Sequence, residues 1–161
     1  MGAKSTKSRK RLSKKDYESL SAFRYALRLF HRFSEEAAEA VGLTPQQHQA
    51  LLAIKGFPGR DRVTNGELAE RLQVRHHSVV GLVNRLEAQG LIVREQGEND
   101  RREFYITLTE RGAELLERLT AVHQEELRHV APQLGAILEG LRSHTSPGAG
   151  QEDSAGQSKL I

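Results

Sequence analysis

Residues 67–86 have the sequence ELAERLQVRHHSVVGLVNRL, and their pattern indicates the fold more clearly than any other segment. Leu68, Ala69 and Leu72 are spaced to face inward from one short helix. The three residues 73–75 are too few for another element and predict a tight turn, after which helical periodicity resumes. Two short helices joined in this way form a helix-turn-helix.

The second helix of this motif is predicted over 76–89, and Gly90 ends it by taking the position after the last turn. Apolar residues at helical spacing form its buried side: Val79, Leu82, Val83 and Leu86. Two β-rich runs follow at 91–95 and 103–107, separated by a polar loop that contains glycine and asparagine. A hairpin after a helix-turn-helix predicts a winged helix-turn-helix.

Upstream, an apolar stripe predicts a long helix over 14–41, about 40 Å in length. Its members recur every three or four residues: Leu20, Phe23, Leu27, Phe30, Phe33, Ala37 and Val41. An apolar stripe of this length is expected to pack against another surface, which is either a second chain or the rest of this domain. A capping box at 44–47 predicts a helix to about residue 54, a Gly/Pro-rich loop follows at 55–61, and a second capping box begins the helix-turn-helix at 64–67.

Downstream, Thr109 is the predicted cap of a further helix, and Pro132 is expected to begin a last one. We therefore expect a mainly α fold with a small β-hairpin. It consists of a winged helix-turn-helix lobe at about 44–108 and a helical dimerisation platform at about 14–41 and 109–142, within a domain spanning 14–143.

Composition excludes several classes of protein. The 161 residues contain no cysteine, which rules out disulfides and thiolate metal sites and fits a cytoplasmic location. No apolar run is long enough for a membrane span, and no secretory signal is evident. No motif of nucleotide-dependent or hydrolytic enzymes occurs, so we expect no enzyme and no cofactor.

Charge is distributed unevenly along the chain. Residues 1–15 contain seven basic side chains and no acid, which leaves 17 basic against 21 acidic residues, a net charge of −4, in the remainder. The segment 1–13 is expected to be a disordered basic arm, which is either simply solvated or in contact with nucleic-acid phosphates. Residues 144–161 have the composition of a flexible tail.

The polar start of the second helix predicts contact with double-stranded DNA. The major groove admits one α-helix, whose first turns then meet base edges. The stretch 75–86 has two arginines, two histidines and no acid, a charge that suits a phosphate-lined groove. The hairpin adds Arg94, Arg101 and Arg102, which could reach a flanking minor groove.

Over roughly 20–142 the sequence resembles the MarR family of bacterial transcription regulators. The most distinctive match is Asp100-x-Arg102 followed by Ile106-x-Leu108-Thr109-x-x-Gly112. The resemblance implies a homodimer whose first and last helices interleave, with two winged lobes on a palindromic operator, and most often a repressor. It also implies that Asp100 orients Arg102, the minor-groove arginine, with Arg101 beside it; the alternative is a surface ion pair of little consequence.

The candidate DNA-binding residues are Arg75, His76, His77, Ser78, Val80, Gly81, Asn84, Arg85, Arg101 and Arg102. The 75–78 start departs from the family pattern, and Gly81 stands where many members have an arginine, so the operator sequence is open. Gly81 is either a place of close approach or simply tolerated.

Other readings of the polar residues remain open. Zinc binding by His76 and His77 is disfavoured because adjacent helical residues diverge by about 100°. A small aromatic or phenolic acid effector, as in many relatives, would draw on candidates from the first two helices, which are otherwise ordinary surface charge: Arg24, Arg28, His31 and His48. A winged-helix protein-interaction module without sequence-specific DNA binding is the alternative function.

Overall fold

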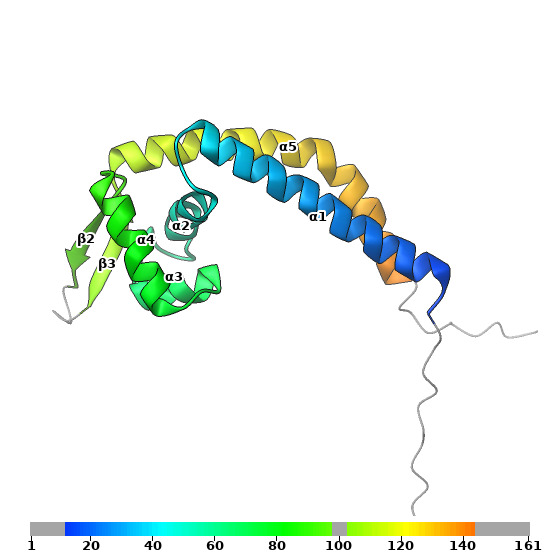
Figure 1. The fold of residues 1–161 in the computed structure, drawn as a ribbon, viewed down its shortest axis with the longest axis horizontal. Coiled ribbons are helices and arrows are strands. Elements are labelled where there is room, and N and C mark those ends of the chain that lie inside the picture. The colour runs from blue at the N-terminus through cyan, green and yellow to red at the C-terminus, as the bar shows by residue number, and fades with distance from the viewer. Residues whose placement is uncertain (1–11, 98–102, 144–161) are drawn as a thin grey trace, which may run out of the picture.

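The computed structural model describes residues 12–97 and 103–143 of the chain (Figure 1). Along the chain it places α1 (Lys14–Ala40), α2 (Pro45–Lys55), β1 (Arg62–Val63), α3 (Asn65–Leu72), α4 (His76–Ala88), β2 (Ile92–Gln96), β3 (Phe104–Leu108) and α5 (Glu110–Ser143). The mainly helical fold with a winged helix-turn-helix is confirmed. Most of the basic arm and all of the expected C-terminal tail lie outside the described residues.

Local sequence signals explain where the helices begin. Thr44 and Thr64 accept hydrogen bonds from the backbone N–H groups of Gln47 and Glu67, whose side chains bond back to the cap, so both predicted capping boxes are present. Ser13 caps α1 in the same way with Asp16. These reciprocal bonds satisfy N–H groups that the first helical turn leaves unpaired.

The turn between α3 and α4 is as tight as predicted. Gln73 has a left-handed backbone (φ 53°), and Val74 N–H returns to the carbonyl of Ala69 at 3.1 Å. Leu68 is fully buried beside the buried side of α4. This packing brings the two helices of the motif together and leaves the opposite side of α4 free.

One prediction about the elements is wrong, and one strand was not predicted. Pro132 does not begin a new helix, because α5 runs without interruption through it. A proline removes one helical hydrogen bond, and the packing of α5 along α1 holds the helix across that position (Figure 1). The hairpin is also joined by a third strand: Arg62 and Val63 pair antiparallel with Thr107 and Ile106, giving the order β1-β3-β2.

The core lies inside the winged lobe, where α2, α3, α4 and the sheet meet. Its largest fully buried members include Leu51, Ile54, Leu68, Leu86, Ile92 and Ile106. From this lobe α1 and α5 extend together as a pair of long helices (Figure 1). Among the described residues, no helix is long and apolar enough to cross a membrane.

The stripe predicted on α1 is covered only in part. Phe23, Leu27 and Phe30 are half-buried, whereas Leu20 remains 52% exposed. A second apolar set on another side of α1, Tyr17, Tyr25 and Leu29, is exposed and was not predicted. Both long helices therefore keep apolar surface that this single chain does not bury.

Candidate nucleic-acid interface

The start of α4 is exposed, as a DNA-reading helix requires. Arg75, His76, His77 and Ser78 are all solvent-accessible, while the apolar side of the helix is at most 3% exposed. Among the described residues no side chain caps the start of α4, in contrast to α1, α2 and α3. Its first N–H groups are therefore available to an anion such as a phosphate.

The outer row of α4 consists of His77, Gly81 and Asn84. Their spacing of four and three residues places them on one side, opposite the residues that pack into the core. A Cβ built on Gly81 would meet only the Arg85 guanidinium, at an ordinary 3.5 Å. Internal packing thus gives no reason for this glycine, which leaves a shallow point in the middle of the outer row.

The remaining predicted residues of α4 differ in exposure. Arg85 and Asn84 are exposed, whereas Val80 is half-buried and presents only part of its side chain. The predicted wing residues Asp100, Arg101 and Arg102 lie outside the described residues. Together with the exposed start of α4, these positions stay predictions of the DNA-binding set.

Arg94 on β2 connects the wing to α4, a role that the sequence did not indicate. Its Nη1 donates to Glu87 Oε2 at 2.9 Å and its Nη2 donates to Asn84 Oδ1. One guanidinium therefore holds two side chains one turn apart on α4. The pairing joins a helix to a strand across the turn between them, so neither the helical nor the strand period could have revealed it.

A second cluster missed by sequence reasoning supports α3. Arg60 pairs with Glu67 at the start of α3, and its guanidinium lies 4.7 Å from the ring centre of Phe57. Burial alone would raise the pKa of Glu67, but the Thr64 N–H and the Arg60 cation outweigh it and leave the pKa below its ordinary value. Arg62 stacks on Tyr105 of β3 at 4.7 Å.

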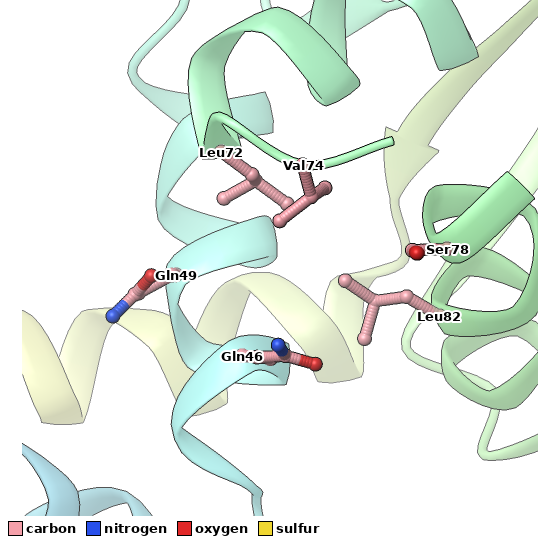
Figure 2. A pocket seen from close by; sticks show the side chains of 6 residues that line it. All are labelled: Gln46, Gln49, Leu72, Val74, Ser78 and Leu82. Atoms are coloured by element: carbon pink, nitrogen blue, oxygen red, sulfur yellow. The ribbon is translucent and has the colours of Figure 1, made fainter. Parts of the chain in front are cut away.

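A small pocket of about 100 Å³ lies between α2 and the helix-turn-helix (Figure 2). Leu72, Val74 and Leu82 form its apolar wall, and three polar side chains complete the lining: Gln46, Gln49 and Ser78. Because Val74 belongs to the turn and Ser78 to the first turn of α4, any occupant would contact α4 directly.

The predicted effector candidates do not gather in that pocket. His48 is 4% exposed and stacks on His123 of α5, with ring centres 4.7 Å apart. Burial, and then the neighbouring His123, lower the pKa of His48. Arg24, Arg28 and His31 lie exposed on α1. His48 is therefore a core residue where α1, α2 and α5 meet, whereas Arg24, Arg28 and His31 are surface residues.

Known proteins resemble this chain in sequence across the winged lobe. Residues 41–103 match the model of the MarR family. The transcriptional activatory protein BadR of Rhodopseudomonas palustris is 33% identical over 91 residues, which are 56% of this chain and 52% of that protein. The homoprotocatechuate degradative operon repressor of Escherichia coli is 32% identical over 94 residues, 58% of this chain and 62% of that protein. The chain thus spans between half and two thirds of these curated relatives.

Solved structures share the fold. MepR, a transcription regulator of the Staphylococcus aureus multidrug efflux pump MepA, matches with a TM-score of 0.67 and 24% identity, over 81% of this chain and 98% of that one. A mutant of MepR bound to an oligodeoxyribonucleotide matches with a TM-score of 0.62 and 24% identity, over 84% of this chain and all of that one. The two curated relatives are named as regulators of transcription and not as enzymes.

Proposed function

We propose that the chain, whose residues 41–103 match the model of the MarR family, is a sequence-specific double-stranded DNA-binding regulator of transcription. In this proposal it acts in the cytoplasm as a homodimer on a palindromic operator, as a repressor that responds to a small ligand. The observation that carries the proposal is the exposed, acid-free start of α4, which forms an uncapped helix N-terminus.

Two features support contact with a duplex. The four residues 75–78 are exposed together, so they can enter a major groove without unfolding any part of the lobe. The turn at Gln73 and the cluster around Arg60 hold α3 as the supporting helix. In the proposed complex Arg102, oriented by Asp100, enters the adjacent minor groove.

The homodimer is supported by apolar surface on the long helices. Tyr17, Tyr25 and Leu29 of α1, and Val122 and Leu127 of α5, are each between 41% and 58% exposed. A second copy of the chain supplies the same surface in return, as a two-fold interface requires. Two lobes then present two α4 helices, and a palindrome of roughly 16–20 base pairs matches that symmetry.

A small aromatic or phenolic acid is the proposed effector. The pocket of Figure 2 combines an apolar wall with amide and hydroxyl groups, which suits a single aromatic ring that carries a polar substituent. A ligand there would press on Val74 and Ser78 and displace the start of α4. The Escherichia coli relative is named as the repressor of the homoprotocatechuate degradative operon, and homoprotocatechuate is a phenolic acid, which agrees in chemistry with this proposal.

The test is a titration of the purified chain with promoter DNA next to its own gene. We expect one discrete complex that random duplex competes for poorly at moderate salt, and a footprint that covers two half-sites. Arg102→Ala should weaken binding and leave the dimer intact, whereas Arg118→Ala, an equal loss of charge on the exposed surface of α5, should not. Binding without preference over random duplex would contradict the proposal and favour a protein-interaction module.

A further inference from the structure

We propose that Arg94 is a positioning residue that decides which DNA base Asn84 reads. The inference rests on the proposed function, since it requires α4 to lie in a major groove. It concerns the outer row of α4, where Asn84 follows Gly81 at the spacing of one helical turn. Asn84 is exposed there, so its amide faces the same solvent as His77.

The contact with Arg94 fixes the orientation of the Asn84 amide. A guanidinium only donates hydrogen bonds, so the Asn84 atom that it touches must be the carbonyl oxygen, Oδ1. The NH₂ group of the amide then points away from Arg94. Arg94 itself is held by its second bond, 2.9 Å to Glu87, and its side chain is only 27% exposed.

Arg94 lies on the core-facing side of β2, next to the exposed end of the strand. It pairs across the sheet with Ile106, which is 1% exposed, and therefore projects from the face that covers the core. Ile92, two residues earlier on the same face, is also buried. The backbone of β2 is thus anchored in the core, and the bonds to Glu87 and Asn84 hold the guanidinium against α4.

A fixed amide changes the base that is recognised. A free asparagine typically binds adenine with both amide atoms, accepting from N6 and donating to N7. Because the contact turns Oδ1 toward Arg94 and the NH₂ group away from it, the amide presents its donors to the groove. The purine edge with two acceptors is that of guanine, through O6 and N7. The structure therefore assigns guanine to the base pair opposite Asn84, and adenine to the same position once Arg94 is removed.

The experiment measures which base each variant prefers at every operator position, because a single binding affinity would not reveal a change in specificity. Operator duplexes changed at each half-site position are titrated with the full wild-type chain and with Arg94→Ala, Arg94→Lys and Asn84→Ala. We expect one position per half-site at which the wild-type chain favours guanine over adenine by about tenfold. Asn84→Ala should abolish this preference, and Arg94→Ala should remove it or reverse it toward adenine.

Two variants separate this role from a merely structural one. Lysine also only donates, so Arg94→Lys should keep part of the guanine preference. Arg118→Ala, on the exposed surface of α5, controls for the lost charge and should leave the whole profile unchanged. Circular dichroism establishes that each variant is folded.

The outcomes distinguish the inference from the proposed function. If Arg94→Ala weakens binding to all operator sequences equally, or leaves the base preference unchanged, the inference is overturned and the proposed function stands. If the wild-type chain shows no sequence preference at all, both are overturned.

Discussion

At the scale of single residues, Gly112 shows why the pattern Leu108-Thr109-x-x-Gly112 accompanies this wing. Thr109 N–H donates to the carbonyl of Leu91 at 3.0 Å, and Thr109 Oγ1 accepts from Gly112 N–H at 3.0 Å. A Cβ on Gly112 would lie 2.0 Å from the Leu91 carbonyl oxygen. The glycine is therefore required by the close approach of α5 to the chain just after α4, and not by its own backbone angles.

Replacing two helical glycines by alanine should have opposite effects on stability. Gly112→Ala forces a side chain against backbone and should lower the free energy of unfolding by about 1–3 kcal/mol or more. Gly81→Ala meets only the flexible end of Arg85, so it should raise that free energy by roughly 0.5–1 kcal/mol through better helix propensity. Urea unfolding of both variants measures the difference, and equal shifts of the two midpoints would contradict this account.

At the scale of elements, a pair of histidines lies where α1, α2 and α5 meet. His123 Nδ1 lies 2.7 Å from the Leu119 carbonyl, which only accepts, so this nitrogen carries the proton. In the neutral ring, Nε2 then accepts from the Ser34 hydroxyl at 2.8 Å. Phe33 closes the joint with its ring centre 5.4 Å from that of His123. A positive charge on the stacked His48 is poorly solvated in this environment.

The stability of the chain should therefore fall in mild acid. The pKa of His48 lies below its ordinary 6.5 in the folded state, so the unfolded chain takes up a proton first as the pH falls. The stabilisation is complete above pH 6.5 and is lost progressively below it, until the folded pKa is reached. Urea midpoints between about pH 7.5 and 5 should show this decline.

A matched pair of variants assigns the effect to the joint. His48→Gln removes the titrating group and should flatten the decline, whereas His129→Gln, at a position 69% exposed on α5, should not. An unchanged slope in His48→Gln would show that other groups cause the acid sensitivity.

At the scale of the whole molecule, the two long helices pack against each other and leave apolar residues exposed to solvent. α1 and α5 pack along each other and extend away from the winged lobe, whose core is complete without their far ends (Figure 1). The exposed apolar residues on these helices keep about half of their surface open to solvent. The lobe should therefore fold independently of the contact between two copies that we propose.

Placing acids on the exposed apolar side of α1, at Tyr25 and Leu29, should separate the two copies of the proposed homodimer. The double substitution Tyr25→Glu with Leu29→Glu should give a monomer in light scattering, because two carboxylates per chain would be buried at the interface. Its circular dichroism should stay native, while operator affinity falls at least about tenfold as one half-site contact is lost. Leu52→Glu, the same change at an exposed leucine of α2, should remain dimeric; a dimeric double variant would place the interface elsewhere.

The amino-acid sequence alone was enough to predict most of the elements, the capped starts of α2 and α3 and the polar, acid-free start of α4. Capping boxes at Thr44 and Thr64 and the spacing of Val79, Leu82 and Leu86 act within a few residues, so they can be read from one chain segment. The exposed outer side of α4 could also be predicted, because it lies opposite the apolar residues that pack into the core.

Features that depend on partners in other elements became visible only in the folded chain. The two-residue strand β1 exists because β3 supplies its hydrogen bonds, and α5 continues through Pro132 with α1 packed along it. The contact of Arg94 with Asn84 and the burial of His48 against His123 likewise join separate elements. Such contacts arise from three-dimensional packing and leave no periodic trace in the sequence.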